Sequence, residues 1–263
     1  MTTTSSGNRA LDPLSWFPYR AGDAPAGLQL FCLPAAGGGA SGYRAWRSAF
    51  GRDVEVVPVQ LPGREARLGE EPIGSAAALV EQLVEPVLAR AGRRFALFGH
   101  SMGALLAYEL AQALTERGRP PIHLIVSALL PPHLIHRRQW KLPVGDMSDA
   151  DLRAYLEDEG GTPTEILDLP DLLDIVLPTL RADLGLCQSY RYTPQPPLPI
   201  PITAFGGDSD PVVTGDLLAG WSERTDGGFR LGLLPGNHHY VYDDVAAITS
   251  AVSSALTEGI DRR

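Results

Sequence analysis

The residues best suited to nucleophilic chemistry are residues 99–103, which read GHSMG with Ser101 at the centre. The apolar run 95–98 precedes them, and residues 104–114 have the periodicity of an amphipathic helix. A G-x-S-x-G sequence on a turn from a strand into a helix exposes its serine and is typical of a serine nucleophile. Glycine is needed on both sides because the turn is too sharp for Cβ atoms there. The backbone N–H of Met102 would face the same space, where it can stabilise an oxyanion.

Such a serine needs an acid and a base, because a serine hydroxyl is a weak nucleophile at its free pKa. On this kind of turn the serine is followed in the chain first by the acid and then by the histidine. Residues 205–211, FGGDSDP, follow a predicted strand and contain Asp208 and Asp210. Asp210 has the spacing expected of the acid, whereas Asp208 is expected to cap the turn.

The candidate bases lie in residues 234–240, LPGNHHY, which follow the last predicted strand. His238 and His239 are both suitable, and the pattern alone leaves the choice between them open. His100 lies inside the GHSMG turn, where its side chain is predicted to point away from the serine. The remaining histidines precede the acid in the chain: His123, His133 and His136.

A glycine-rich loop at residues 33–40, LPAAGGGA, follows the first strong strand. A loop at this place can supply a second backbone donor for the oxyanion. A glycine-rich loop can also bind phosphate at a helix N-terminus. This one lacks the Lys-Ser/Thr ending of a P-loop and the G-x-G-x-x-G spacing of a dinucleotide site, so the oxyanion role is favoured.

The elements that must position these segments are short apolar strands alternating with helical patterns. Strands are predicted at residues 28–33, 54–59, 95–98, 124–128, 202–206 and 229–234. Helices are predicted at residues 43–50, 75–90 with Ser75 as N-cap, 102–117, 216–225 and 245–256. This alternation predicts a mostly parallel sheet flanked by helices on both faces. With the serine turn, it predicts an α/β-hydrolase fold whose core comprises residues 16–130 and 201–258.

Residues 131–200 interrupt the alternation, because no strand is predicted there. Helix-like segments at 148–159, 164–167, 171–176 and 179–191 are separated by prolines and glycines. We expect a helical lid over the active site, since the insertion leaves and rejoins the sheet at the edge where ligands bind. The alternative is a second helical domain without a role in the site. At the other end of the chain, residues 1–15 are predicted to form a disordered leader.

The composition, with 44% hydrophobic and 20% charged residues among 263, is that of a globular chain with a full core. A net charge of −9 and the lack of an evident basic face argue against binding to nucleic acid. Cys32 and Cys187 are predicted to be buried free thiols, as in a reducing compartment. Neither a signal-peptide core nor an apolar run of roughly 18 residues is present, so we expect a cytoplasmic protein without a membrane partner.

Six segments spread along the chain resemble one known family. They read PAAGGGA at 34–40, QLPGRE at 60–65 with Arg67, GHSMG at 99–103, LPTLRAD at 177–183, GGDSDP at 206–211 and GNHHY at 236–240. Together they are similar to the type II thioesterases, the stand-alone editing thioesterases of polyketide and non-ribosomal peptide synthases. The similarity extends from about Trp16 to Val252. The QLPGRE and LRAD segments separate this family from general lipases and esterases.

The resemblance implies a role for each matching residue. Ser101 corresponds to the nucleophile, Asp210 to the acid and His238 to the base. The backbone N–H groups of Ala36 and Met102 correspond to the oxyanion donors.

Three positions depart from the family pattern. Ala35 stands where the family usually has histidine, Asn237 replaces a glycine, and His239 replaces an aromatic residue. His238 occupies the histidine of the family motif, which selects it over His239.

The activity implied is hydrolysis of acyl groups from the phosphopantetheine arm of a carrier protein, which clears stalled or mis-primed units from a synthase. No cofactor or metal is implied, because the arm belongs to the substrate, and the protein is expected to be a monomer. Carrier proteins are commonly acidic, so a basic cluster near the pocket would suit them, and its candidates are Arg64, Arg67, Arg137, Arg138 and Lys141. The alternative, favoured at least equally, is that these are solvated surface residues or form local salt bridges.

Other interpretations remain open. The same fold and triad serve small-molecule carboxylesterases and acyltransferases. The chain-terminating thioesterase domain of a large synthase and a non-catalytic scaffold are further alternatives.

Overall fold

The computed structural model describes residues 13–19, 27–138, 140, 142–159 and 169–258. Within them, one sheet has the strand order β2-β1-β3-β4-β5-β6, and every neighbouring pair is parallel. The strands are β1 (Leu28–Leu33), β2 (Val54–Pro58), β3 (Phe95–His100), β4 (Leu124–Ser127), β5 (Ile202–Gly207) and β6 (Phe229–Leu234). Each strand begins and ends within two residues of its predicted bounds, which confirms the predicted parallel sheet.

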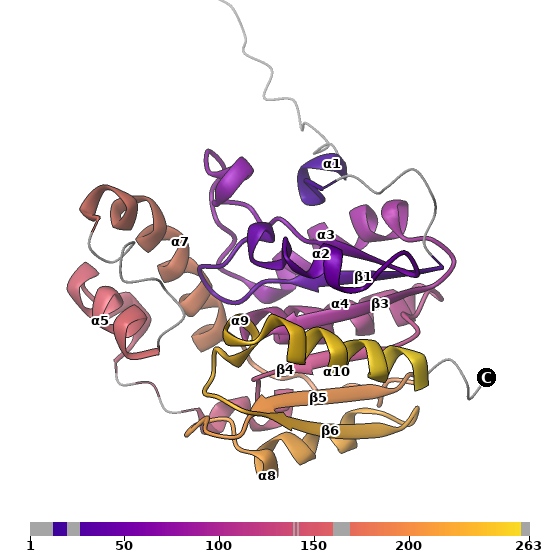
Figure 1. The fold of residues 1–263 in the computed structure, drawn as a ribbon. Coiled ribbons are helices and arrows are strands. Elements are labelled where there is room, and N and C mark those ends of the chain that lie inside the picture. The colour runs from indigo at the N-terminus through magenta and orange to yellow at the C-terminus, as the bar shows by residue number, and fades with distance from the viewer. Residues whose placement is uncertain (1–12, 20–26, 139, 141, 160–168, 259–263) are drawn as a thin grey trace, which may run out of the picture.

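Helices cover both faces of this sheet (Figure 1). On one face lie α3 (Ala76–Arg90) and α4 (Met102–Glu116), and on the other lie α2 (Trp46–Ala49) and α10 (Val245–Glu258). Successive residues of β3 point to opposite faces, so Leu97 joins the first apolar core and Phe98 joins the second. Ser75 caps α3 as predicted, with its hydroxyl accepting the N–H of Ala78 at 3.4 Å.

The strand register gathers the predicted site segments at one edge of the sheet. Leu33 at the end of β1 pairs with Gly99, and Gly207 at the end of β5 pairs with Leu234. His100 at the end of β3 pairs with Ser127 of β4. The loops that follow β1, β3, β5 and β6 therefore all leave the sheet at this edge, where open α/β sheets bind their ligands.

The regular elements in the described part of residues 131–200 are helices joined by loops, apart from an isolated bridge at Leu198, and residues 190–200 have no helix. The insertion contains η3 (Pro132–Arg137), η4 (Val144–Asp146), α5 (Asp149–Glu159) and α7 (Pro170–Ser189). The predicted break between residues 176 and 179 is wrong, because α7 continues through Pro178. A proline removes one helical hydrogen bond, and burial of apolar residues such as Leu177 and Leu180 on either side offsets that loss. The predicted helix at 164–167 lies outside the described residues.

The insertion has a small apolar core of its own, separate from the two clusters of the sheet. Its buried members come from η4 and the residue after it, from α5 and from α7: Val144, Met147, Leu152, Leu156, Leu173, Leu177, Leu180 and Leu184. Ala36, in the glycine-rich loop after β1, packs against this core. In Figure 1 the insertion lies at the left, beside the edge of the sheet where those loops emerge.

The remaining short elements refine the predicted boundaries. The helices predicted at 43–50 and 216–225 each consist of two pieces, η1 (Ala40–Tyr43) with α2, and α8 (Gly215–Leu218) with η5 (Ala219–Arg224). Two further short elements are η2 (Glu65–Arg67) and α9 (Tyr240–Asp243). Residues 13–15, which fall in the predicted leader, are helical in α1 (Pro13–Trp16); the rest of that leader lies outside the described residues.

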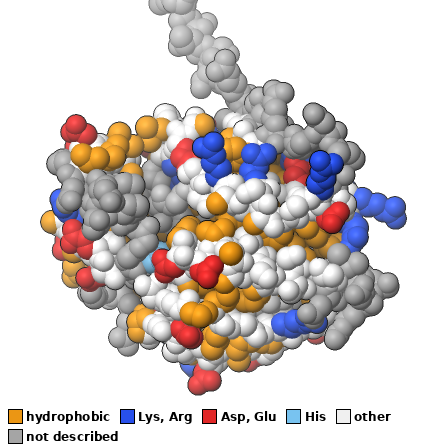
Figure 2. Space-filling view, in the orientation of Figure 1, with side chains coloured by type: hydrophobic (Ala, Val, Ile, Leu, Met, Phe, Trp, Pro, Cys, Tyr) orange, Lys and Arg blue, Asp and Glu red, His pale blue; other side chains and the backbone are white. Residues whose placement is uncertain are grey.

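The surface and the cysteines agree with the composition. Figure 2 shows one face of the molecule, on which basic side chains are scattered among acidic and uncharged ones. Cys32 and Cys187 are free thiols, and burial raises the pKa of each. Among the described residues, no helix has the length and apolar content that crossing a membrane requires.

Candidate active site

The turn that carries Ser101 has the strained geometry predicted for it. Ser101 has φ 52° and ψ −120°, a conformation that a side-chain-bearing residue rarely adopts. A Cβ atom on Gly99 would lie 2.0 Å from the carbonyl oxygen of Gly103, and one on Gly103 would lie 2.1 Å from that of Leu33. Both glycines are therefore required by close backbone approach, and Ser101 is held at the carboxyl edge of the sheet.

Ser101, His238 and Asp210 form one chain of hydrogen bonds. His238 Nε2 lies 3.0 Å from Ser101 Oγ, and His238 Nδ1 lies 2.9 Å from Asp210 Oδ2. The loops after β5 and β6 meet closely, since a Cβ atom on Gly207 would lie 2.2 Å from the carbonyl oxygen of Asn237. The structure thus brings together the three side chains that the sequence selected, in the arrangement of a nucleophile, a base and its orienting acid.

The environment of Asp210 keeps it ionised beside His238. Its second oxygen, Oδ1, accepts the backbone N–H groups of Val212 at 2.8 Å and Val213 at 2.9 Å. Burial raises the pKa of Asp210, but the hydrogen bonds from His238 and from these two amides outweigh burial and hold the pKa below its ordinary value. An ionised carboxylate fixes the His238 tautomer that carries its proton on Nδ1.

Asp208, the alternative candidate for the acid, has a structural role. Asp208 Oδ1 accepts the N–H of Gly236 at 3.1 Å and the hydroxyl of Ser209 at 2.9 Å. Asp208 therefore holds the turn before His238, as the sequence predicts.

The alternative base does not reach the serine. The ring of His239 stacks on Tyr242 and stands nearly perpendicular to the ring of His238, 5.2 Å away. Burial, with a smaller effect of His238, lowers the pKa of His239 to about 4. His239 is therefore a neutral aromatic side chain behind the base. His100 points away from Ser101, with its Nδ1 lying 2.9 Å from the hydroxyl of Ser127.

The two backbone amides expected to bind an oxyanion belong to adjoining segments. Met102 is the first residue of α4, where helix N–H groups have no acceptor within the helix. Ala36 is the second residue of a turn closed by the Gly38 N–H bonding the carbonyl of Ala35 at 3.0 Å, with Gly37 at φ 72°. Within the described part of the chain, neither amide donates a hydrogen bond. Both donors are available to a ligand.

The predicted basic cluster is wrong for two of its members. Arg64 is buried and forms a two-point ion pair with Asp183 of α7, at 2.6 and 2.9 Å. Arg67 is also buried, where it pairs with Glu70 and stacks on Trp16 at 4.0 Å. A guanidinium can be buried when all its donors are bonded, a condition that sequence does not reveal.

The other members of the predicted cluster differ among themselves. Arg137 is exposed. Arg138 stacks on Trp140 at 4.7 Å and donates to the hydroxyl of Tyr155 at 3.3 Å. Lys141 lies outside the described residues.

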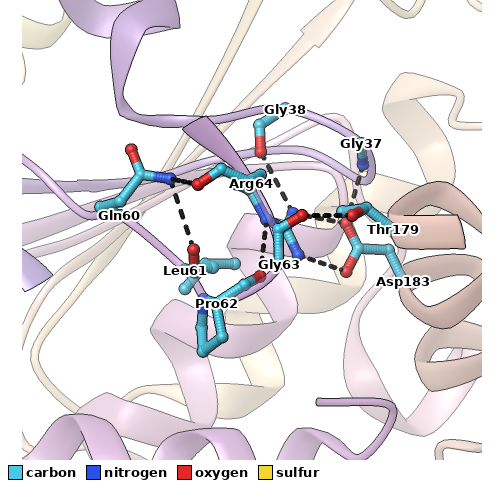
Figure 3. Close-up of polar contacts among 9 residues, drawn as sticks. All are labelled: Gly37, Gly38, Gln60, Leu61, Pro62, Gly63, Arg64, Thr179 and Asp183. Atoms are coloured by element: carbon cyan, nitrogen blue, oxygen red, sulfur yellow. Dashed lines mark hydrogen bonds and ion pairs between the residues drawn. The ribbon is translucent and has the colours of Figure 1, made fainter. Parts of the chain in front are cut away.

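The Arg64–Asp183 pair is a feature that reasoning about the site residues missed (Figure 3). Its only sequence signal was the presence of Arg64 in QLPGRE and Asp183 in LRAD. In the fold these two segments lie against the glycine-rich loop. The hydroxyl of Thr179 adds a further contact to the carbonyl of Gly63 at 2.6 Å.

A cavity of about 500 Å³ lies between the insertion and the triad. Its insertion side includes Trp140, Met147 and Tyr155, and its core side includes Val213 and His238. The lining is largely apolar, as in sites for acyl chains and other small molecules. No cluster of three or more metal-binding side chains occurs among the described residues.

A serine, a histidine and an aspartate linked in this order at the carboxyl edge of a parallel sheet define a serine hydrolase of the α/β-hydrolase fold. A family model described as thioesterase domain matches residues 28–256, and the chain belongs to this family. It is a hydrolase of thioesters.

Individual relatives agree with this assignment. The chain is 38% identical to the gramicidin S biosynthesis protein GrsT of Aneurinibacillus migulanus, over 87% of this chain and 88% of the relative. The solved structure of RedJ, a thioesterase from the prodiginine pathway of Streptomyces coelicolor, is 37% identical with a TM-score of 0.80, covering 96% and 97% of the two chains. The type II thioesterase BorB of the borrelidin cluster is 38% identical with a TM-score of 0.80, covering 88% and 93%.

Proposed function

We propose that this chain hydrolyses acyl groups from the phosphopantetheine arm of acyl or peptidyl carrier proteins. By this reaction it clears stalled or mis-primed units from a polyketide or non-ribosomal peptide synthase. The observation that carries the proposal is the hydrogen-bonded chain Ser101–His238–Asp210 in a member of the thioesterase family, with His238 and Asp210 bordering a largely apolar cavity.

In the first step His238 Nε2 takes the proton of the Ser101 hydroxyl as the serine oxygen attacks the thioester carbonyl carbon. The negative charge that develops on the carbonyl oxygen is stabilised by the N–H groups of Ala36 and Met102. Asp210 keeps the His238 ring oriented and stabilises its positive charge. The tetrahedral intermediate then expels the pantetheine thiolate, which takes the proton from His238 and leaves as a thiol.

In the second step His238 takes a proton from water, and the resulting hydroxide attacks the carbonyl carbon of the acyl-serine. The second tetrahedral intermediate collapses, the serine oxygen recovers its proton from His238, and the free acid leaves. The steps use the side chains of this one chain and water. The phosphopantetheine belongs to the substrate, and no other cofactor enters the reaction.

The insertion acts as a lid in this proposal. Trp140, Met147 and Tyr155 form one wall of the cavity, while His238 and Val213 form the wall opposite. A helical domain without a role in the site would not border the triad, so the lid is favoured over that alternative. Among the basic residues first considered for the carrier protein, Arg137 and Arg138 remain candidates, because Arg64 and Arg67 are buried in ion pairs.

We further propose a monomer, since the triad is complete within one chain and needs no residue from a second copy. Location in the cytoplasm stays a prediction.

The test is release of free acid from an acyl-loaded carrier protein, measured for the wild type and for Ser101→Ala. We expect the variant to lose at least about 10⁴-fold in kcat, because no other group can form the acyl-enzyme. Full turnover by Ser101→Ala would contradict the proposal.

Comparison of carrier-bound thioesters with oxygen esters of the same acyl group separates this function from a small-molecule carboxylesterase. A carboxylesterase would show equal or higher kcat/KM on the oxygen ester. A scaffold without activity would also fail to react at Ser101 with a fluorophosphonate.

A further inference from the structure

The glycine-rich loop of residues 34–40 is held from outside by two side chains that take no part in the triad. Asp183 Oδ2 accepts the backbone N–H of Gly37 at 2.8 Å. Arg64 donates to the carbonyl oxygen of Gly38 at 3.1 Å. Figure 3 shows both contacts. Ala36 directly precedes Gly37, so Asp183 binds the peptide group next to the proposed oxyanion donor, and Arg64 binds the same loop two residues further on.

Arg64 and Asp183 are also bound to each other, and their donors and acceptors are engaged on every side. The guanidinium donates twice to Asp183 and once, through Nε, to the carbonyl of Pro62 at 3.2 Å. Both side chains are buried, with relative exposures of 7% and 1%. A buried ion pair of this kind is weak evidence for a stabilising role, since apolar residues of similar volume often serve a core equally well. Its particular contribution here is to orient two groups toward the glycine-rich loop: the Asp183 carboxylate as an acceptor and the Arg64 guanidinium as a donor.

The turn at Ala36 depends on such an acceptor. Gly37 has φ 72°, which together with the bond from Gly38 N–H to Ala35 defines a turn of type II. The central peptide of this turn, between Ala36 and Gly37, points its N–H at Asp183. Without the carboxylate this N–H would be left without a partner in a partly buried place, and a turn with the peptide reversed would compete. Arg64 neutralises the carboxylate, so the acceptor does not oppose an oxyanion nearby.

Asp183 belongs to α7 and therefore to the insertion. Leu180, one turn earlier on α7, would lie 3.3 Å from a Cβ atom on Gly37, and Ala36 packs against the apolar core of the insertion. Helix α7 of the insertion thus contacts the glycine-rich loop through both polar and apolar atoms.

We infer that Asp183 and Arg64 are positioning residues of the oxyanion hole, through which helix α7 of the insertion sets the orientation of the Ala36 amide. This inference rests on the proposed function, because it assumes that the Ala36 N–H binds the oxyanion. By this inference the carboxyl-terminal half of α7 is part of the catalytic machinery. Any motion of the lid then takes place in segments other than Asp183 and its neighbours.

The test compares kcat and KM for an acyl-pantetheine thioester in three variants. Asp183→Leu removes the acceptor of the Gly37 N–H and is expected to lower kcat about 10- to 100-fold and to leave KM within about twofold, because only the transition state carries the oxyanion. Thr179→Val is the matched control: it removes a buried bond between the same helix and the same segment without touching residues 34–40. It is expected to lower the midpoint of thermal unfolding and to keep kcat.

The third variant separates positioning from folding. Arg64→Met/Asp183→Leu replaces the buried pair by apolar side chains, so no buried charge is left without its partner. It is expected to unfold at a higher temperature than Asp183→Leu alone, with kcat still lowered because the Gly37 N–H has no acceptor. Full kcat in this double variant would overturn the inference, as would full kcat in Asp183→Leu. Because Ser101→Ala is assayed in parallel, loss of activity there with full activity in the Asp183 variants would refute this inference alone. Full activity of Ser101→Ala would instead refute the proposed function.

Discussion

The two halves of the active site are built by different means. The half with Ser101, Asp210 and His238 rests on loops directly after β3, β5 and β6, and its geometry is set by backbone approach at Gly99, Gly103 and Gly207. The half with Ala36 rests on a loop after β1 whose outer side is held by side chains from distant segments. The first half takes its geometry from the sheet, and the second is held by Asp183 of the insertion and Arg64 of the segment after β2.

Because of this difference, the two halves should be sensitive to different kinds of substitution. Glycines that allow a strained turn tolerate no side chain, so the triad half is sensitive to added atoms. The oxyanion half is sensitive to removed atoms, because leaving one member of a buried ion pair without its partner costs about 3–5 kcal/mol.

Loss of the base is expected to have the largest effect of the substitutions outside the serine. His238→Gln should lower kcat by roughly 10⁴-fold or more, because Ser101 then has no group to take its proton. The matched control is the adjacent residue: His239→Phe keeps a ring stacked on Tyr242 and should retain kcat within a few fold. Steady-state hydrolysis of an acyl thioester measures both. A larger loss in His239→Phe than in His238→Gln would reverse the assignment of the base.

Removal of the proposed donor in the other half should have an intermediate effect. Ala36→Pro deletes the N–H at the second position of the turn, a position where proline is favoured, so the loop conformation can be kept. We expect kcat to fall about 10²–10³-fold, as for loss of one oxyanion donor elsewhere.

Ala36→Gly keeps the N–H and serves as the control, with a much smaller loss of kcat. The two variants should also differ in their affinity for a trifluoromethyl ketone that mimics the tetrahedral adduct. Equal affinities would remove Ala36 from the oxyanion hole.

Acid pH should lower the stability of the folded chain through His239, which lies beside the base in the triad half of the site. The pKa of His239 is about 4 in the folded chain, mainly because the ring is buried, against an ordinary value of 6.5. Between these values the unfolded chain binds a proton that the folded chain does not, so the free energy of unfolding falls as pH drops from 6.5 towards 4. Since the ring is partly exposed, we expect a contribution of about 1 to 2 kcal/mol.

His239→Phe removes this titration. Denaturant unfolding at pH 7 and at pH 4.5 should show a smaller loss of stability in the variant than in the wild type. An equal loss in both would show that His239 does not contribute to the acid sensitivity.

The sequence was most informative where local physics and chain order act together. The strands were predicted from apolar runs, because both faces of a parallel sheet are buried. Ser101 followed from the need for glycine on a sharp turn. Asp210 and its neighbour Asp208 were separated by spacing, whereas the choice of His238 over His239 needed a family resemblance. The structure gives that choice a physical reason, since only His238 lies within 3.0 Å of the serine hydroxyl.

The predictions that failed depended on neighbours far away in the chain. Pro178 was expected to end a helix, and α7 continues through it because its flanking leucines are buried in the insertion. Arg64 and Arg67 were expected at a basic surface, and each is buried against a carboxylate. Helix periodicity and charge say which side chains are polar or apolar, but not which partner they will meet.

The sequence by itself determined the parallel sheet, the strained serine turn and the order of nucleophile, acid and base, because these follow from backbone sterics and from residues close to strand ends. Only the tertiary structure decided that Asp183, 119 residues from Arg64, would join it beside the loop of Ala36. The reason is physical: whether a charge is buried and paired depends on contacts between segments that share no local pattern, and these contacts exist only once the insertion has packed against the sheet.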